Sequence, residues 1–405
     1  MATWLEDILD RTDELESPKS YYYWSSLTAI SAVVKRNIYL ERFSYKLYPN
    51  IFVFLIGHSG IRKGPPVKFA KDLVTRVSNT RVISGRASIQ AIIRDLSNAR
   101  TQENGSILSD SSAFIASGEF AASLVEDPQA LTILTDLYDA HYNDKWENTL
   151  KGGGEANKTE TLKDPYIVLL GASNQVHFRD VIPKTALGGG FIARSFIVLE
   201  ERRNRLNSLT KRPSKALDVD RSAEYLRMLA TIKGEFQWEP DAIERYDEWY
   251  YKFGKEDVDD KTGTLSRIGD SVLKVAMLLS LARSPDLQLT AVDIDDALIA
   301  CQNFYSNINR TMLSGQASTE LGKQVGLFLE ELIAFNDDEN GMSRQNFLRK
   351  HWGAIDAQIL DRVIDTCMQS GVIKIKRVSA KEIYYKLTEE TFKQYSEFNN
   401  EKRKE

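Results

Sequence analysis

Short apolar runs alternate with stretches of helical spacing between residues 50 and 200. Runs rich in Val, Ile and Phe predict strands that are covered on both faces, as in a parallel sheet. Strands that alternate with helices are typical of a mostly parallel α/β domain. The predicted strands are, in chain order, Ile51–Ile56, Val82–Ile83, Ser112–Ala116, Tyr166–Leu170 and Arg194–Leu199.

The chain on either side of this region follows the spacing of helices. Residues 1–45 are predicted to form a helical N-terminal segment that is interrupted at Ser17–Pro18. Residues 217–312 are predicted to be all helical and contain the largely apolar run Val272–Leu281. We therefore divide this part of the chain into an N-terminal segment (1–45), an α/β core (46–210) and a helical domain (217–312).

Residues 320–396 predict a smaller unit, which a charged tail (397–405) follows. Three helices are expected over Leu321–Ala334, from Ser343 onward, and over Asp356–Ser370; two strands, Val372–Val378 and Glu382–Leu387, complete the unit. This order is that of a winged-helix domain. Basic residues of its hairpin are predicted to contact nucleic-acid phosphates; they are Lys374, Lys376 and Arg377. The alternative is a wing that binds a protein partner without touching DNA.

Composition excludes several classes of protein. The 405 residues carry a net charge of −4, which argues against a histone-like basic coat but permits a local basic patch for nucleic acid. Two cysteines and four histidines without metal-ligand spacing make a structural zinc site unexpected. No run approaches 18 apolar residues and residues 1–16 are unlike a signal peptide, so we expect a cytoplasmic protein that does not contact a membrane.

The strongest chemical signal follows the first predicted strand. The segment 57–64 has the lysine spacing of the phosphate-binding loop G-x-x-x-x-G-K-[ST], with two departures. Arg62 stands at the second glycine, and Gly64 replaces the residue that contacts Mg²⁺. Backbone amides of such a loop surround phosphate oxygens, and Lys63 would reach the β- and γ-phosphates. The predicted nucleotide-binding residues are Gly57, Ser59, Gly60, Arg62, Lys63 and Gly64.

An ATPase also needs groups that orient water and sense the γ-phosphate. Glu119, after the third predicted strand, fits the water-polarising glutamate, although Gly118 occupies the position of a Mg²⁺-binding aspartate. Asn174, after the fourth strand, suits the γ-phosphate sensor. Arg194, at the start of the fifth, suits an arginine finger that reaches a neighbouring subunit's nucleotide; Arg202 or Arg203 is the alternative. Ser117 or Asp110 is the candidate replacement for the missing Mg²⁺ contact.

These motifs together resemble the AAA+ ATPases, and most closely the primase/helicase-like ATPases of phages and plasmids. The resemblance covers roughly residues 20–310 and rests on six motifs in order, together with a helical segment (267–279) that looks like the lid of minichromosome-maintenance-type helicases. The six motifs are Tyr48–Asn50, Gly57–Lys63, Gly118–Phe120, Leu134–Asp139, Gly171–Asn174 and Gly190–Arg194.

The resemblance implies ATP and Mg²⁺ as cofactors and a ring, expected to be a hexamer. It implies that Lys274, or alternatively Arg267, is a cation that senses the nucleotide from the lid. It also implies that a hairpin between Tyr138 and Pro165 projects into the ring pore, where Lys151 and Lys158 contact the DNA backbone. The alternative for this stretch is a solvated surface loop. Asn104-Gly105 marks a second insertion, within Ser97–Asp110.

The sequence thus predicts an ATP-dependent DNA-translocating motor, a replicative helicase of a phage or mobile element in its bacterial host. Single-stranded or forked DNA and a primase or other replication proteins are the expected partners. The first alternative is a replication initiator or helicase loader, in which nucleotide drives assembly alone. The second is a non-catalytic DNA-binding scaffold with a degenerate ATP site.

Overall fold

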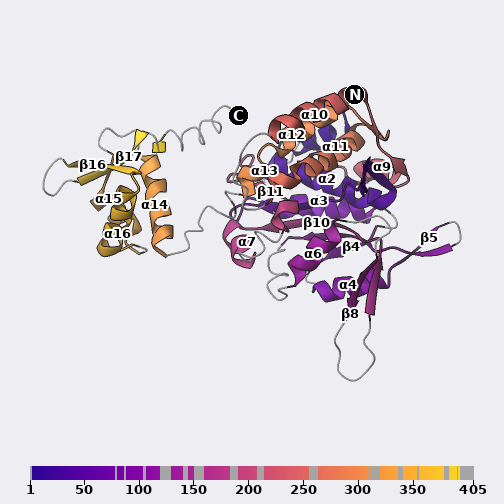
Figure 1. Ribbon diagram of the computed structural model, residues 1–405, viewed down its shortest axis with the longest axis horizontal. Coiled ribbons are helices and arrows are strands. Elements are labelled where there is room, and N and C mark those ends of the chain that lie inside the picture. The colour runs from indigo at the N-terminus through magenta and orange to yellow at the C-terminus, as the bar shows by residue number, and fades with distance from the viewer. Residues whose placement is uncertain are drawn as a thin grey trace, which may run out of the picture. The chain divides into compact units, whose positions relative to one another are not determined.

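The computed structural model describes two compact units, Met1–Thr311 and Met312–Glu405. All structural statements concern its described residues, which are 2–77, 80–85, 88–103, 106–118, 129–139, 145–149, 159–182, 190–207, 214–254, 263–308, 311, 320–335, 341–353, 355–377, 383–389 and 391–392. Helices and strands of both units are labelled in Figure 1.

A five-stranded parallel sheet forms the centre of the first unit. Its order is β11-β3-β10-β7-β4, and each neighbouring pair is parallel. Every residue of β3 and β10 is buried, which explains why the sequence reads as continuous apolar runs. All five predicted strands and the mixed α/β class are confirmed. The strands are β3 (Phe52–Ile56), β4 (Val82–Ser84), β7 (Ser112–Ser117), β10 (Tyr166–Ser173) and β11 (Ser195–Leu199).

Helices lie on both faces of this sheet. Helices α2 (Lys19–Val34) and α3 (Gly64–Thr75) pack on one face, with α6 (Ala130–Tyr138) on the other (Figure 1). Helix α2 is buried along most of its length because α1 (Trp4–Thr12), α9 (Val219–Leu229) and α11 (Ile268–Arg283) cover its outer side. Two further helices follow strands of this unit, α4 (Ile89–Ser97) and α7 (Gln175–Val181).

The predicted helical domain packs directly against the N-terminal helices, and both belong to the same compact unit. Helix α11 is buried on all sides between α2 and α12, as its nearly uniform apolar sequence requires. The predicted α/β core (46–210) and helical domain (217–312) therefore belong to one compact unit and are not separate compact units. The other helices of this part are α10 (Pro240–Phe253), α12 (Ala291–Cys301) and α13 (Phe304–Ile308).

Two predictions of purely helical structure were wrong in detail. The first 45 residues also contain a strand, β1, whose side chains alternate between buried and more exposed positions. Strand β1 pairs with β2 and with β12, and β12 comes from the region that was predicted to be all helical. The strands are β1 (Ile38–Arg42), β2 (Tyr45–Leu47) and β12 (Gly234–Glu235). A second short parallel pair lies within residues 217–312 and joins β13 (Gln237–Trp238) to β14 (Gln288–Leu289).

Two antiparallel hairpins extend from the first unit at the expected insertions. The first pairs β5 (Arg100–Glu103) with β6 (Ser106–Ser109), and the second pairs β8 (Lys145–Thr149) with β9 (Thr159–Lys163). The two strands of the hairpin expected before the fourth strand are therefore present. Its place in a ring pore and the alternative of a solvated surface segment both stay predictions. Lys151 and Lys158 lie outside the described residues.

The second unit has the predicted order of three helices and a hairpin. Its core contains Phe328, Phe347, Leu360 and Tyr385, which come from all three helices and the last strand. The sequence did not predict the short strand β15. This strand pairs with β17, so the order of the sheet is β15-β17-β16. The elements are α14 (Glu320–Ala334), β15 (Met342–Ser343), α15 (Arg344–His351), α16 (Ala357–Gln369), β16 (Ile373–Arg377) and β17 (Ile383–Leu387).

Across the ranges that the structure describes, no helix combines the length and hydrophobicity needed to cross a bilayer.

Candidate nucleotide-binding site

The connections of the central sheet diverge between β3 and β10. Strand β3 leads through α3 towards β4 at one edge, whereas β10 leads to β11 at the opposite edge. In an open α/β sheet, the point where connections diverge leaves a crevice at the carboxyl ends of the strands, where ligands bind. The segment 57–63 follows β3 at this point, and the Gly57 amide donates to the Ser173 carbonyl at the end of β10, 3.4 Å away.

The segment 57–63 turns through two residues with left-handed backbone conformations. Gly60 and Arg62 both adopt left-handed conformations, with φ of 87° and 65°. Glycine favours this conformation and other residues rarely adopt it. Arg62 therefore keeps the backbone that a glycine would supply at its position, so this departure from the motif does not alter the turn. Ile61 is buried and anchors the loop, while Ser59 is exposed.

Lys63 lies at the start of α3, where the helix directs unpaired amides towards the loop. Its Nζ donates to the carbonyls of Gly57 and His58 at 2.7 and 2.8 Å. Burial lowers the pKa of Lys63 from its ordinary value. An ammonium has three donors, so one remains to meet a phosphate oxygen while both carbonyl contacts persist.

Gly57 and Gly64 are glycines for different reasons. A Cβ at Gly57 would lie 2.6 Å from the Glu200 carbonyl oxygen and 2.7 Å from the Tyr21 hydroxyl, which itself donates to the Ile56 carbonyl. At Gly64, outside its chain neighbours, no atom lies within 4 Å of the added carbon. Gly64 is, however, a helical residue directly before Pro65, a position that disfavours residues with a Cβ. Glycine is therefore favoured at position 64 because a proline follows it. This glycine lacks the hydroxyl with which a serine or threonine of the motif would contact Mg²⁺.

A network from the N-terminal segment and the end of β11 holds the loop from outside. The Glu16 carboxylate accepts from Arg62 Nε at 2.7 Å and from Arg203 Nη1 at 3.0 Å. Arg203 Nε also donates to the Gly60 carbonyl at 2.9 Å, and the Ser17 hydroxyl donates to the Arg62 carbonyl at 2.7 Å. The Arg62 hydrogen bond lowers the pKa of Glu16. Two arginines thus flank the loop with a carboxylate between them.

The carboxyl edge of the sheet carries the predicted sensor and Mg²⁺ positions. Asn174 directly follows β10, and its side chain accepts from the His177 amide at 2.7 Å as the cap of α7. Gly118 directly follows β7 and has no atom within 4 Å of an added Cβ outside its chain neighbours. Ser117 ends the same strand and is buried. Glu119 lies outside the described residues.

Asp110 is not at this edge, which corrects its candidacy as a Mg²⁺ contact. It precedes β7, at the amino edge of the parallel sheet, and its carboxylate pairs with Lys35 Nζ at 2.7 Å. Strand β7 separates it from the carboxyl edge by its six residues, roughly 20 Å. Of the two proposed replacements, Ser117 alone has a position compatible with the role.

Lys274 also lies at the amino edge, which contradicts its prediction as a lid sensor of this chain's nucleotide. Its Nζ donates to the Asn50 side chain at 2.8 Å and lies 3.9 Å from the centre of the Tyr138 ring. Asn50 precedes β3, so the five residues of that strand, roughly 16 Å, separate Lys274 from the phosphate loop. Burial lowers the pKa of Lys274 to about 7. Its alternative, Arg267, precedes the same helix.

Arg194 forms an ion pair within its own chain. It ends the short 3₁₀ helix η2 (Ile192–Arg194) and precedes β11 rather than belonging to it, which corrects the predicted start of that strand. Its Nε and Nη2 donate to both oxygens of Asp139, at 2.9 and 2.8 Å, and Nη1 donates to the Gly190 carbonyl. Its side chain is only 12% exposed. A finger role in a neighbouring subunit would require this bidentate pair to open.

Arg203, in contrast, follows β11 and lies beside the loop of its own chain. The sequence contained the signal: in a parallel sheet, a residue before a strand lies at the amino edge and one after it lies at the carboxyl edge. Arg203 is therefore the arginine that the fold brings to the candidate site.

The predicted DNA-binding residues of the second unit lie on one strand. Lys374 and Lys376 are exposed on β16, where Lys374 lies directly opposite Lys386 of β17. Lys374 Nζ is 4.0 Å from Glu389, which is itself almost fully exposed. Arg377 ends the strand.

Comparisons with known proteins identify no family for this chain: no family model matches it, and no curated protein is a significant match. In the part of the chain that the structure describes, no group of three or more His, Cys, Asp or Glu side chains is arranged to hold a metal ion. Mg²⁺ commonly binds through nucleotide phosphates and waters with one or two protein ligands, so an ATP site does not require such a group.

Proposed function

We propose that this chain is an ATP-dependent DNA-translocating ATPase of the AAA+ type, with a winged-helix unit at its C-terminal end. The observation that supports this most directly is the position of the glycine–lysine loop. It joins β3 to the start of α3 at the point where the sheet connections diverge, which is where α/β proteins bind nucleotides.

In this proposal the loop amides and Lys63 bind the nucleotide phosphates. Ser117, which ends β7, would help to hold Mg²⁺, and the ion would supply positive charge that neutralises the phosphates. Glu119 would orient the attacking water, and Asn174 would hydrogen-bond the γ-phosphate. Arg203 takes the place of Lys274 as the cation that contacts phosphate from within the chain. Arg194 is kept as the finger of a hexameric ring, acting when its Asp139 pair opens.

The DNA would be contacted by the β8–β9 hairpin and by the second unit. In the second unit the exposed face of α16 includes Asp361, Asp365 and Arg362, so that helix carries more negative than positive charge. The lysines of β16 are therefore the better phosphate contacts, and a sequence-tolerant interaction is expected.

The second candidate function is an initiator or helicase loader, in which ATP binding drives assembly without sustained turnover. Two observations favour it. Neither Gly64 nor Gly118 supplies a Mg²⁺ ligand, and the guanidinium of Arg194 is engaged by Asp139. A scaffold with a degenerate site is the third possibility, and it predicts no nucleotide binding.

ATP hydrolysis with and without single-stranded DNA separates these functions. The wild-type chain is compared with Lys63→Ala, which removes the phosphate cation, and with Lys68→Ala, an exposed lysine of α3, as matched control. DNA-stimulated turnover that is lost only in Lys63→Ala, with displacement of a strand from a forked duplex, supports the motor. ATP binding without turnover identifies the assembly switch, and absence of a nucleotide-dependent thermal shift refutes both.

A further inference from the structure

The hairpin of the second unit turns one face to its core and the other face away from it. Side chains alternate between the two faces along a strand. Four residues of β16 and β17 face the core: Ile373, Ile375, Tyr385 and Leu387. The residues at the alternate positions form the opposite face, which we call the outer sheet face: Lys374, Lys376, Tyr384 and Lys386.

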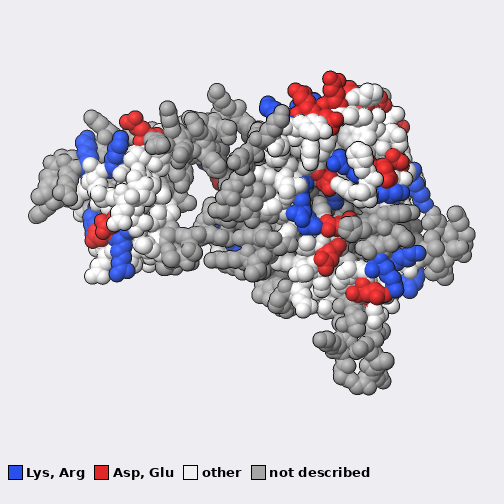
Figure 2. Space-filling model, in the orientation of Figure 1, with Lys and Arg blue, Asp and Glu red and all other residues white. Residues whose placement is uncertain are grey.

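The strand register brings the members of the outer sheet face together. Lys374 lies directly opposite Lys386, and Lys376 lies directly opposite Tyr384. Opposite residues of an antiparallel pair have Cβ atoms about 5 Å apart, and alternate residues of one strand are roughly 7 Å apart. Three lysine side chains therefore start from neighbouring points around one aromatic ring. Basic side chains are visible in Figure 2 where Figure 1 places β16 and β17.

The positive charge of this face is weakly offset at Lys374. Its Nζ lies 4.0 Å from a carboxylate oxygen of Glu389, and the two side chains are 64% and 98% exposed. An ion pair so exposed contributes little. Like charges at directly opposite positions destabilise a strand pair, so Lys374 and Lys386 repel each other across the hairpin. A phosphate bound between these two lysines would relieve the repulsion.

A close backbone approach positions the stem of Lys386. Gly341 directly precedes β15 and has a φ of 79°, a conformation that glycine favours. A Cβ at Gly341 would lie 2.6 Å from Lys386 Cγ and 2.5 Å from the Tyr385 carbonyl oxygen. The stem of Lys386 therefore lies against the backbone at Gly341, where a larger residue would displace it.

Tyr384 lies in the middle of the three-stranded sheet. It belongs to the central strand, and its direct neighbours are Lys376 on β16 and Ser343 on β15. Tyr384 is partly exposed, whereas Tyr385 beside it in the chain is buried in the core. Bases of a single strand stack on such rings with little regard to sequence, because every base has a π-face.

Helix α16 argues against a duplex as the ligand of this unit. In a helix-turn-helix the second helix of the motif enters the major groove and lies near the phosphates of both strands. The exposed residues of α16 include Asp361 and Asp365 against the single cation Arg362. Carboxylates at these positions would repel a duplex, whereas a single strand on the outer sheet face meets lysines.

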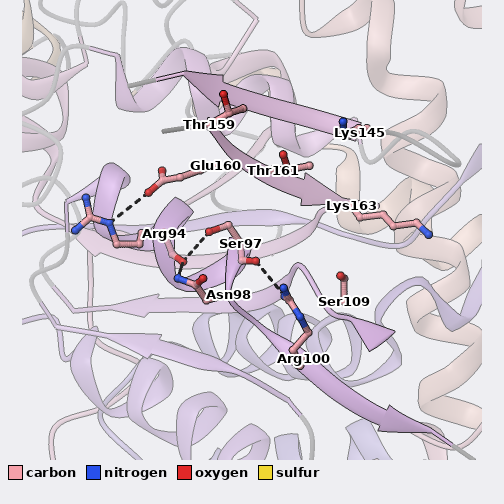
Figure 3. A pocket seen from close by; sticks show the side chains of 10 residues that line it. All are labelled: Arg94, Ser97, Asn98, Arg100, Ser109, Lys145, Thr159, Glu160, Thr161 and Lys163. Carbon is pink, nitrogen blue, oxygen red and sulfur yellow. Dashed lines mark hydrogen bonds and ion pairs between the residues drawn. The ribbon is translucent and has the colours of Figure 1, made fainter. Parts of the chain in front are cut away.

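A cavity of the first unit also carries basic residues, but they do not converge. It has a volume of about 560 Å³ and lies at the roots of the two hairpins (Figure 3). Arg100, Lys145 and Lys163 line it, and their charged ends point to separate places. One phosphate cannot meet them together. The outer sheet face is therefore the better set of cations around one position.

We propose that the outer sheet face binds single-stranded DNA, with one base stacked on Tyr384 and the adjoining phosphates at Lys374, Lys376 and Lys386. The proposal rests on the DNA-binding part of the function proposed above. It goes further by assigning the second unit to a single strand rather than to a duplex, and it does not depend on the ATP site.

The first test locates the stacked base by photochemical crosslinking. The full chain is irradiated with an oligo(dT) that carries 5-iodouracil, a base that crosslinks to an aromatic ring stacked on it, and the crosslinked peptide is identified by mass spectrometry. We expect a crosslink at Tyr384 that Tyr384→Phe retains and Tyr384→Leu loses. An unlabelled hairpin duplex is expected to compete for this crosslink much more weakly than unlabelled oligo(dT).

The second test measures affinity by fluorescence anisotropy of a labelled oligo(dT). The variant Lys374→Gln/Lys386→Gln is compared with Lys68→Gln/Lys252→Gln, which removes two exposed lysines of other helices. Two lost phosphate contacts lower the salt slope by about 1.4, so raising the salt from 0.1 to 1 M costs the wild type about 25-fold more affinity than the variant. Tyr384→Leu should weaken binding about 5- to 150-fold, and Tyr384→Phe should bind like the wild type. Removal of the opposed lysines does not lower the Tm, which separates lost affinity from unfolding.

Several outcomes overturn the proposal. They are a chain that does not bind oligo(dT), binding without a crosslink at Tyr384, equal competition by the duplex, and equal salt slopes in the Lys374→Gln/Lys386→Gln variant and the wild type. The ATPase function is judged separately. A crosslink at Tyr384 in a chain that does not bind ATP refutes the ATPase and supports the outer sheet face, whereas DNA-stimulated hydrolysis without that crosslink does the reverse.

Discussion

Replacing Gly118 by aspartate tests whether the carboxyl edge of the sheet binds Mg²⁺ with a nucleotide. Gly118 is exposed and directly follows β7, and outside its chain neighbours no atom lies within 4 Å of an added Cβ. Because its φ is not in the left-handed range, a side chain is accommodated without backbone strain. Gly118→Asn has the same shape without the charge and is the matched control.

The exposure of Gly118 sets the size of the expected effect. In a water-like dielectric, a carboxylate about 4 Å from Mg²⁺ gains about 2 kcal/mol, which corresponds to about 30-fold in affinity. Without Mg²⁺ the same carboxylate repels the phosphates, so Gly118→Asp should then bind ATP more weakly than Gly118→Asn. Titrations with a fluorescent ATP analogue, with Mg²⁺ and with EDTA, measure both effects.

An equal Mg²⁺ dependence in Gly118→Asp and Gly118→Asn would refute the reasoning. It would mean that the end of β7 does not face a bound metal–nucleotide complex, and the proposed position of the phosphates would be wrong.

Two further predictions concern charges around the same sheet. Glu16→Gln removes a carboxylate beside Arg62 and Arg203; we expect ATP to bind about two- to fivefold more tightly because the phosphates then meet less repulsion, and weaker binding would show that Glu16 is needed to shape the loop. Burial lowers the pKa of Lys274 from its ordinary value of 10.5 to about 7 in the folded chain. Between pH 7 and 10.5 the Lys274 side chain is therefore protonated in the unfolded chain and neutral in the folded chain. The free energy of unfolding should therefore rise with pH from about 7 to 10.5 in the wild type relative to Lys274→Met, as measured by denaturant unfolding; parallel profiles would contradict the buried position of Lys274.

Much of the first unit could be predicted from local patterns. The five central strands are continuous apolar runs because parallel strands are buried on both faces, and the glycine–lysine spacing marked the loop after the first of them. The strand Ile38–Arg42 was missed because it lies beside a helical stretch, and its partner strand comes from residues 234–235. Pairing with a distant segment leaves little signal in a local window.

The candidate site was predicted in part for the same reason. The positions of Gly57 and Asn174 were predictable because each directly follows a strand that the sequence shows, and Lys63 ends the loop after the first of these strands. Arg194 and Lys274 were predicted to contact the nucleotide phosphates because of their order along the chain. Both residues lie instead at the amino edge of the central sheet, opposite the glycine–lysine loop. Arg194 precedes its strand, so its edge was predictable, whereas the place of Lys274 depends on how α11 packs against α2.

The sequence by itself determined the five central strands, the order of the main elements and the glycine–lysine turn, because these depend on periodicity and on residues that are neighbours in the chain. Only the tertiary structure decided which charges meet. It brought Glu16 and Arg203 to the loop from 187 positions apart, and it placed Lys274 beside Asn50 and Tyr138. Such contacts form when buried helices and strands pack into one core, and that packing is a property of the whole unit rather than of any local segment.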